Sequence, residues 1–202
     1  MTPPYPPNPT RPITRPITRP ITEPIALRPL EPGDAATIEH LFNDSGVYRY
    51  MAAAMPVPYT QQDALDFIQA CREGKRLEWG ITVDGQLAGC IGSTLPERDE
   101  KGIPTALTGY WIGRAFWHRG VMTRALHLFL QAVAEHLPED GRVQAKVFAP
   151  HVVSQRILLH AGFTQEPGFE LKPMRDGLPH VTFVYNLPAS RLREETFGKE
   201  AP

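Results

Sequence analysis

One stretch of the chain changes its hydrophobic period half-way and restricts the fold more than any other: GYWIGRAFWHRGVMTRALHLFL at 109–130. Its first residues alternate small or polar with apolar side chains, which is typical of a half-buried strand. From Val121 the apolar residues recur at helical spacing, namely at Met122, Leu126, Phe129 and Val133. The segment between the two patterns is basic and contains Gly120. The stretch therefore predicts a strand, a basic turn and a helix in succession.

This order of elements is typical of an anion-binding site. The first backbone N–H groups of a helix have no partner inside the helix, and the helix dipole favours negative charge there. Gly120 would allow a ligand to approach the backbone closely, and Arg119 would add charge-assisted hydrogen bonds. On spacing alone, an ordinary turn with solvated arginines is an equally good interpretation.

The same residues carry a resemblance to a known family. GYWIGRAFWHRGVMTRAL resembles the acetyl-CoA-binding segment of GNAT acetyltransferases, in particular of their RimJ/RimL-like branch. Three other segments agree with that branch and extend the resemblance over roughly 25–188: IALRPLEPGDA, PYTQQDALDFI and HVVSQRILLHAGF. The resemblance implies an enzyme that moves an acetyl group from acetyl-CoA, its co-substrate, to a primary amine by direct attack in a ternary complex.

The resemblance also implies where acetyl-CoA binds. The family pattern for the pyrophosphate loop, Gln/Arg-x-x-Gly-x-Gly/Ala, falls on 117–122 and keeps its central Gly120. Trp117 stands in place of the leading Gln or Arg, and Met122 stands at the last position, as is familiar in this branch. The cofactor-binding residues implied in this way are Tyr110, Trp111, Ile112, Trp117, His118, Arg119, Gly120, Val121, Met122 and Thr123.

The rest of the pattern predicts an α+β domain with a mixed sheet. The expected strands are 25–30, 77–83, 86–95, 106–113 and 142–149, with a last pair at 163–169 and 180–187. The expected helices are one that Asp34 caps and that runs to Phe42, one after a capping box at 60–63, one from Val121, and one from Pro150 to Ala161. The resemblance implies the GNAT fold, a mostly antiparallel sheet flanked by helices. In that fold the central parallel strands, here 106–113 and 142–149, splay apart around the pantetheine arm of the cofactor.

Both ends of the chain differ in composition from the middle. Residues 1–24 are rich in proline and contain repeats of Arg-Pro-Ile-Thr, which forbid helix formation and favour a disordered arm. The alternative is a partner-binding arm whose isoleucines dock in a groove. Residues 25–188 form the predicted N-acetyltransferase domain, and the charged tail at 189–202 is expected to fray.

Composition and charge disfavour several classes of function. With 21 Lys and Arg against 22 Asp and Glu, the formal net charge is −1, which gives no electrostatic case for nucleic-acid binding. Cys71 and Cys90 lie far apart and predict neither a metal site nor a disulfide framework. No apolar run approaches the length of a membrane span, and the N-terminus lacks the apolar core of a signal peptide. We therefore expect a soluble cytoplasmic protein, with a homodimer as one option for its assembly.

Acyl transfer needs donors for an oxyanion, an acceptor for the amine proton, and stabilisation of the departing thiolate. The resemblance assigns the first task to backbone N–H groups of 110–112. It assigns the third task to Ser154 as the catalytic acid, because HVVS at 151–154 matches the Asn-x-x-Ser of this branch, with His151 replacing the asparagine. The other interpretation of Ser154 is a first-turn helix residue that bonds only backbone. The tyrosine that serves as the acid in many other GNAT enzymes would fall near Leu158.

The acceptor for the amine proton is missing from its usual place. Many family members carry a glutamate just before the GYW segment, where this chain has Ala-Leu-Thr with Leu107 at its centre. The alternatives are Glu78, His118, His151 and Glu170. An α-amine with a pKa near ~7.7–8.0 is partly neutral at pH 7, whereas a lysine side chain with a pKa near ~10.4 is not. The missing carboxylate therefore favours an α-amine, or another amine of low pKa, as the acceptor.

The identity of the amine stays open between a protein N-terminus, a polyamine, an aminoglycoside and an amino acid. Aromatic side chains could line its site, although most aromatics belong to the core: Tyr48, Tyr50, Trp79, Trp111 and Trp117. Arg49 could hold an acidic group of the acceptor or form a surface ion pair. The alternative to an enzyme is a non-catalytic acyl-CoA-binding module. A nucleotide-dependent enzyme is disfavoured because both G-x-G-x-x-G and the P-loop motif are absent.

Overall fold

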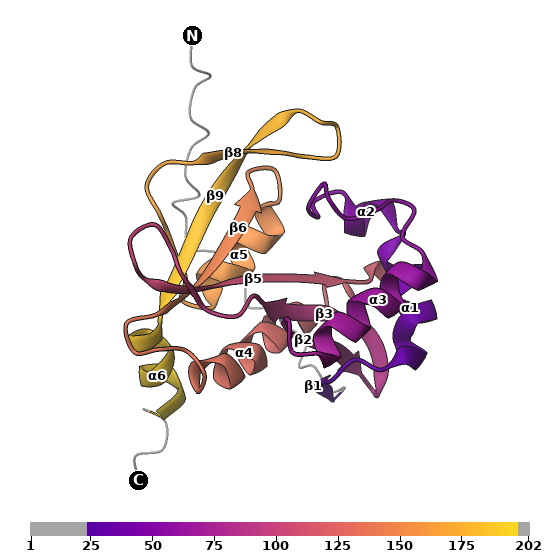
Figure 1. The fold of residues 1–202 in the computed structure, drawn as a ribbon, viewed down its shortest axis with the longest axis horizontal. Coiled ribbons are helices and arrows are strands. Elements are labelled where there is room, and N and C mark those ends of the chain that lie inside the picture. Colours follow the sequence, from indigo (N-terminus) through magenta and orange to yellow (C-terminus); the bar gives the residue numbers. More distant parts are fainter. Residues whose placement is uncertain (1–23, 198–202) are drawn as a thin grey trace.

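A nine-stranded sheet runs through the described part of the chain (Figure 1). The structure, a computed structural model, describes residues 24–197, so the arm predicted at 1–24 lies outside the described residues except for Pro24. The strand order is β1-β2-β3-β5-β6-β9-β7, with β4 beside β5 and β8 beside β9. The strands are β1 (Ile25–Arg28), β2 (Leu77–Val83), β3 (Gln86–Ser93), β4 (Glu97–Arg98), β5 (Pro104–Ile112), β6 (Arg142–Phe148), β7 (Thr164–Gln165), β8 (Glu170–Pro173) and β9 (Pro179–Pro188).

The sheet is mixed, as the sequence predicts. Strands β5 and β6 pair in parallel, whereas the other pairs in the described part are antiparallel. The strand–helix–strand unit of β5, α4 and β6 supplies the crossover that parallel pairing requires. The α+β class is therefore confirmed, with the parallel pair at the centre of the sheet.

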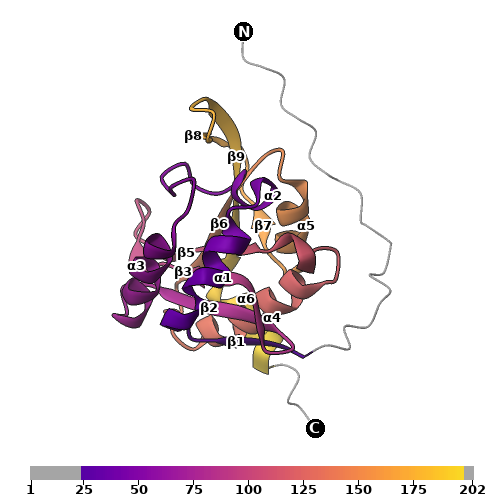
Figure 2. The same cartoon turned by 90° about the vertical axis from the view of Figure 1, so that its right-hand side faces the viewer.

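Helices cover the two faces of this sheet, and α3 and α4 lie on opposite sides of it in Figure 2. One core packs α1 and α3 against β3 and Trp111, and the other packs α4, α5 and α6 against the opposite face. The helices are α1 (Ala35–Phe42), α2 (Ser45–Tyr48), α3 (Gln61–Arg72), α4 (Val121–Ala134), α5 (Val152–His160) and α6 (Ala189–Phe197), with short 3-10 turns at Pro32–Asp34 and Arg114–Phe116. None of the helices in the described part is long and apolar enough to cross a membrane.

Two local predictions are confirmed by their hydrogen bonds or dihedral angles. At the start of α3, the Asp63 N–H donates to Thr60 Oγ1 at 3.1 Å, and the Thr60 N–H donates to Asp63 Oδ2 at 2.8 Å. These two bonds form the capping box. Between β2 and β3, Asp84 and Gly85 have φ of 49° and 77°, as a two-residue hairpin turn requires.

Asp34 precedes α1 as expected, but its carboxylate does not cap that helix. It accepts two hydrogen bonds from Arg28, at 2.7 and 2.8 Å, and one from the Glu31 N–H at 2.8 Å. The prediction that Asp34 caps α1 is therefore wrong, because a bidentate arginine on β1 competes for the same oxygens.

The tail after Pro188 differs from its prediction in the described part. The sequence led us to expect fraying from 189 onwards, yet α6 covers Ala189–Phe197. Ala189 and Leu192 are buried against the α4 side of the sheet. Arg193 also donates to Leu137 O at 2.9 Å. Two buried side chains and this bond anchor a segment whose charge dominates its composition.

The central strands separate half-way along their length. β5 pairs with β6 from Thr105 to Thr108, opposite Arg142 to Ala145. Beyond that point 109–112 pairs with β3, and 146–148 pairs with β9, while no ladder joins β5 to β6 among the described residues. The predicted splay is present, and the edge of β5 at 109–112 borders it.

Candidate active site

The turn that follows the splay leads directly into helix α4. His118 and Gly120 both adopt positive φ, at 59° and 72°, and Gly120 is the residue that precedes the first turn of α4. Because glycine has no side chain, the start of α4 receives no side-chain cap. The free N–H groups of that turn and the positive end of the helix dipole form a site suited to a phosphate group.

The ten residues predicted to bind cofactor divide into those that offer side chains and those that offer only backbone. His118 and Arg119 are exposed, and the Arg119 guanidinium lies 5.6 Å from the centroid of the Phe116 ring. Val121 and Met122 are buried in the α4 core. These two side chains therefore cannot line a binding site, and only their backbone N–H groups face the turn.

Trp117 turns back onto the strand that precedes it. Its Nε1–H donates to Ile112 O at 2.9 Å, and Arg114 lies 5.3 Å above its ring. Arg114 in turn donates to both carboxylate oxygens of Asp44, at 2.7 and 2.5 Å. Trp117 therefore fixes the shape of the turn, and the Asp44 pair ties the turn to the start of α2.

The three residues of β5 beside the splay point to alternate faces of the sheet. Trp111 packs edge-on against Phe42, with ring centroids 5.6 Å apart, on the α1 side. Tyr110 and Ile112 pack on the α4 side. What 110–112 share at the splay is therefore their backbone, as an oxyanion site made of N–H groups would require.

Tyr110 meets Ser154 across the splay. The two hydroxyl oxygens, Tyr110 Oη and Ser154 Oγ, lie 2.8 Å apart, and either can be the donor. The same tyrosine hydroxyl also donates to Ser154 O at 3.4 Å. Ser154 is 6% exposed, and burial raises the pKa of Tyr110 far above its usual range. Sequence reasoning placed only the backbone of Tyr110 in the site and missed its hydroxyl.

His151 and Leu158, the other two positions compared with the family, lie before α5 and within it. His151 precedes the helix, and its ring stacks on Tyr50 at a centroid distance of 4.3 Å. Burial, assisted by the charge of Arg49, lowers the pKa of His151 to about 4. Leu158 is fully buried in the core, so the position of the family's tyrosine holds an apolar residue and offers no acid here.

The carboxylates considered as proton acceptors have very different environments. Glu170 contacts Lys146 at 2.9 and 3.0 Å and Lys172 at 3.2 Å. Burial raises the pKa of Glu170, but the two lysines outweigh this effect and lower the pKa overall. The side chain of Glu78 is 7% exposed, and burial raises its pKa against the opposing effect of Arg76.

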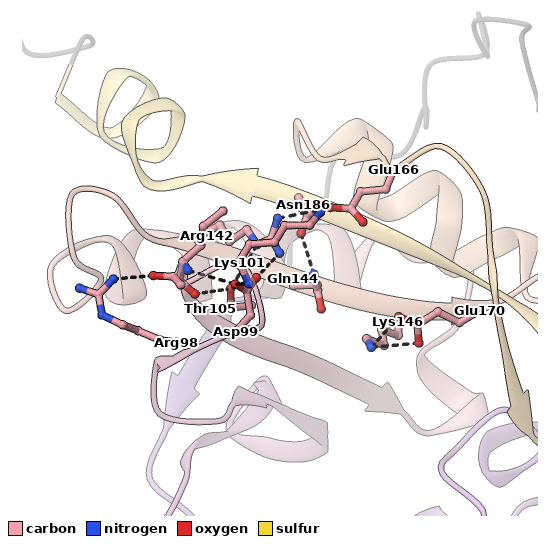
Figure 3. A network of polar contacts seen from close by, with 12 residues as sticks. Arg98, Asp99, Lys101, Thr105, Arg142, Gln144, Lys146, Glu166, Glu170 and Asn186 are labelled. Atoms are coloured by element: carbon pink, nitrogen blue, oxygen red, sulfur yellow. Dashed lines mark hydrogen bonds and ion pairs between the residues drawn. The ribbon is translucent and has the colours of Figure 1, made fainter.

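Polar side chains along β6 join this strand to its neighbours (Figure 3). Arg142 bonds the Asp99 carboxylate, donates to Thr105 Oγ1 at 3.1 Å and donates to Glu166 at 3.3 Å. Gln144 donates to Asn186 at 3.0 Å. Because Arg142 and Thr105 are also the first paired residues of β6 and β5, this network clamps the two strands at the end of their paired stretch that lies away from the splay.

The turn between β8 and β9 reaches over to the segment after α2. Arg175 donates to three carbonyl oxygens there: Tyr48 O at 3.0 Å, Met55 O at 2.8 Å and Ala52 O at 3.3 Å. Its guanidinium also lies 5.4 Å from the centroid of the Tyr48 ring. No local pattern indicates this bridge, because its partners lie 120 to 127 residues away in the chain. No group of three or more potential metal-binding side chains occurs within 24–197.

The fold and this geometry agree with a known family. The model of the acetyltransferase (GNAT) domain matches residues 25–164. The chain belongs to the GNAT acetyltransferase family. It is therefore an acetyltransferase whose acetyl donor is acetyl-CoA. A search of curated proteins gives no significant match.

Solved structures of other GNAT acetyltransferases share the fold. The microcin self-immunity acetyltransferase MccE, in complex with acetyl-CoA and AMP, is 21% identical and has a TM-score of 0.70, covering 83% of this chain and 94% of that chain. RimJ of Mycobacterium smegmatis, in complex with CoA-disulfide, is 19% identical with a TM-score of 0.68, covering 86% and 89%. An enzyme from Salmonella typhimurium that modifies the N-terminal serine of a 50S ribosomal subunit protein is 19% identical with a TM-score of 0.67, covering 84% and 97%.

Proposed function

We propose that this GNAT enzyme, within a domain spanning 25–188, acetylates a primary amine of low pKa, of which a protein N-terminal α-amine is the best example. The observation that carries the catalytic part of the proposal is the pair of hydroxyl groups, Tyr110 and Ser154, 2.8 Å apart beside the splayed strands. The choice of an α-amine rests on its low pKa, which leaves part of it neutral at pH 7, so that it needs less help from a base than a lysine side chain does. It is supported by the RimJ and N-terminal serine acetyltransferases among the similar structures.

Acetyl-CoA supplies an activated acetyl thioester, and the residues that would hold it are those of the turn and the splay. The uncapped start of α4 would bind the pyrophosphate through its backbone, with Arg119 adding a charged donor. The β5 edge at 109–112 would hydrogen-bond the pantetheine arm, since no ladder joins it to β6 among the described residues. Backbone N–H groups of 110–112 would donate to the oxyanion that forms at the thioester carbonyl.

Ser154 would protonate or stabilise the departing thiolate. Tyr110 has two acceptors on the same residue, Ser154 Oγ and Ser154 O. When the tyrosine proton is donated to Oγ, the serine proton is free to point elsewhere. The hydroxyl pair can therefore present the Ser154 proton toward the sulfur while Tyr110 keeps the oxygen in place. A thiol with a pKa near ~8.5 leaves readily, so this help is modest.

The experiment that tests the proposal measures release of free thiol from acetyl-CoA with a panel of amines. The panel contains the peptide Ser-Ala-Ala-Ala, Nα-acetyl-lysine amide and spermidine, and a reaction without amine gives the background. We expect the highest kcat/KM with the peptide α-amine at pH 7. Tight binding of acetyl-CoA without thiol release for any amine would instead establish a non-catalytic acyl-CoA-binding module.

A further inference from the structure

Glu78 on β2 has one carboxylate oxygen that is bound and one that is free. Arg76 donates to Oε1 through Nε at 3.0 Å and through Nη2 at 2.7 Å. No hydrogen bond from any described residue reaches Oε2. Within 24–197, Ser93 Oγ is the one fully enclosed side-chain polar atom without a partner, so Oε2 is not sealed off from solvent. A carboxylate in this state can still accept a proton at Oε2.

The Oε2 atom of Glu78 lies above Gly92, which is paired with Gly109 at the splay. Glu78 is paired with Gly92 on β3, and Gly92 is paired with Gly109 on β5, so the three residues form one row across the sheet. A Cβ atom added at Gly92 would lie 2.3 Å from Glu78 Oε2, whereas one added at Gly109 would meet nothing within 4 Å. The carboxylate therefore leans across Gly92 toward the open space above Gly109.

Simple strand geometry places this oxygen close to the reacting edge. Adjacent strands are spaced by about 4.8 Å, so an atom above Gly92 is roughly one strand spacing from Gly109. That gap accommodates an amine nitrogen or one water molecule. Gly109 begins the stretch of β5 that is paired with β3 but not with β6. Leu107, two residues earlier on β5 and 39% exposed, belongs to the same face, and the family resemblance implies a glutamate at this position.

The other candidates for the same task are weaker. Glu170 is held by two lysines, which keep it ionised and lower its basicity. His151 is stacked on Tyr50 with a pKa of about 4. His118 lies in the turn before α4, where the pyrophosphate is proposed to bind. Glu78 alone among these four combines burial, a carboxylate oxygen without a hydrogen bond from any described residue, and an open position in its row at Gly109.

We propose that Glu78 is the proton acceptor for the attacking amine, reaching from β2 across Gly92 and replacing the carboxylate that β5 lacks at Leu107. This inference rests on the acetyl transfer proposed above. The amine nitrogen forms a bond to the acetyl carbon, and the carbon–sulfur bond breaks with its electron pair going to sulfur. The proton lost by nitrogen goes to Glu78 Oε2 and then to water, while the thiolate takes a proton from Ser154 or water. The net products are an amide and free coenzyme A.

The ionisable groups around Glu78 determine whether its carboxyl group is ionised and able to accept a proton. Arg76 holds Oε1, Cys71 faces Glu78 from α3, and Cys90 faces it from β3. Burial raises the pKa of both thiols, so neither carries charge near pH 7. Arg76 is thus the neighbouring charge that keeps Glu78 ionised, and its removal raises the pKa of the carboxyl further.

The decisive experiment compares Glu78→Gln with wild type, using whichever panel amine gives the highest wild-type kcat/KM. We expect kcat/KM to fall by about 100-fold at pH 7, the lower end of the range for a positioned base. The loss should shrink as the pH rises through the pKa of the amine. Affinity for acetyl-CoA and the melting temperature should not fall, because the variant keeps the size of the side chain and removes a partly desolvated charge.

Three further variants separate a chemical role from a structural one. Leu107→Glu in the Glu78→Gln background should recover at least tenfold of the lost rate, since it restores a carboxylate to the same face. Arg76→Gln should move the acidic limb of the pH profile to higher pH. Glu170→Gln, the competing carboxylate, should keep the wild-type limb.

Two results would overturn the inference. One is a Glu78→Gln variant with the wild-type rate and pH profile. The other is an acidic limb of the pH profile that shifts in Glu170→Gln but stays unchanged in Arg76→Gln. If wild type itself releases no thiol with any amine, the proposed function fails first. A failure confined to the Glu78 variants leaves acetyl transfer intact.

Discussion

The two sides of the active site that we propose for this GNAT enzyme are assembled in different ways. The cofactor side is one continuous segment, from the β5 edge through the turn at Gly120 to the first turn of α4. The proposed acceptor side combines Glu78 on β2 with the segment after α2, which Arg175 contacts from a turn more than a hundred residues away in the chain. A single substitution can therefore disrupt the cofactor side, because it consists of one stretch of local backbone. The acceptor side depends on several weaker contacts between distant side chains.

This contrast predicts that the largest effect of one substitution on acetyl-CoA binding lies on the cofactor side. We expect Gly120→Asp to weaken acetyl-CoA binding by about 100-fold, measured by calorimetry. A non-glycine residue at a φ of 72° costs about 1–2 kcal/mol, and a negative charge at a helix N-terminus facing pyrophosphate adds a similar amount. Each 1.4 kcal/mol corresponds to a factor of ten in affinity.

Gly120→Asn is the matched control for that variant. Asparagine has nearly the same size and the same tolerance for the left-handed conformation, but it carries no charge. If both variants bind acetyl-CoA equally poorly, backbone strain explains the effect. If Gly120→Asp binds as tightly as wild type while remaining folded, the turn before α4 is not the pyrophosphate site.

The next effect, on kcat and not on acetyl-CoA binding, is expected at Ser154. Ser154→Ala should lower kcat by ~10- to 100-fold with little change in acetyl-CoA affinity, because the hydroxyl matters mainly once charge builds on sulfur. Tyr110→Phe should lower kcat less than Ser154→Ala does, since it leaves the serine proton in place. Steady-state kinetics for both variants test the order. Equal rates for wild type and Ser154→Ala would leave catalysis to alignment and the backbone donors.

The same contrast explains what could be read from the sequence. The strand, turn and helix at 109–130 follow from local periodicity, and so do the capping box at Thr60 and the hairpin turn at Asp84. The tertiary partners of Arg175 and the hydroxyl contact between Tyr110 and Ser154 do not, because they join segments that only the folded sheet brings together. The α6 helix was missed since its two buried apolar residues are outnumbered by charges.

Glu78 illustrates the boundary between these two kinds of information. The sequence shows a glutamate on an alternating strand, and such a residue is more often an ordinary surface or structural residue than a base. Only the register places Gly92 and Gly109 in its row, and only the packing removes its carboxylate from bulk water. The sequence identifies candidate residues by their chemistry, whereas the fold determines which of these residues lie close together.

On the acceptor side, a smaller effect is expected from Arg175. Arg175→Met removes the donors to three carbonyl oxygens of the segment after α2. We expect the KM for the amine to rise about tenfold, since partly exposed hydrogen bonds from a charged group contribute about 1.5 kcal/mol or less in total after solvent screening. The affinity for acetyl-CoA should stay constant. Arg175→Lys should behave like Arg175→Met, because one ammonium group cannot reach three carbonyls. A wild-type KM for the amine in either variant would show that the contacts of Arg175 do not shape the acceptor site.

The smallest effect at neutral pH is expected at His151, and its test is a pH profile. The folded-state pKa of about 4 lies below the usual value near ~6.5, so the ring is neutral at pH 7 and already present in the form that stacks on Tyr50. His151→Phe keeps an aromatic ring for that stack and should leave kcat at pH 7 within about twofold of wild type, because it removes no group used in catalysis. No activity limb near pH 6.5 should depend on this residue.

The effect of His151 on stability does depend on pH. Between pH 6.5 and 4 the unfolded chain binds a proton at His151 that the folded chain does not, so wild type should lose stability as the pH falls through that window. His151→Phe should flatten that part of the curve of melting temperature against pH. A limb of kcat near pH 6.5 that disappears in His151→Phe would make the histidine, and not Glu78, the base that takes the amine proton.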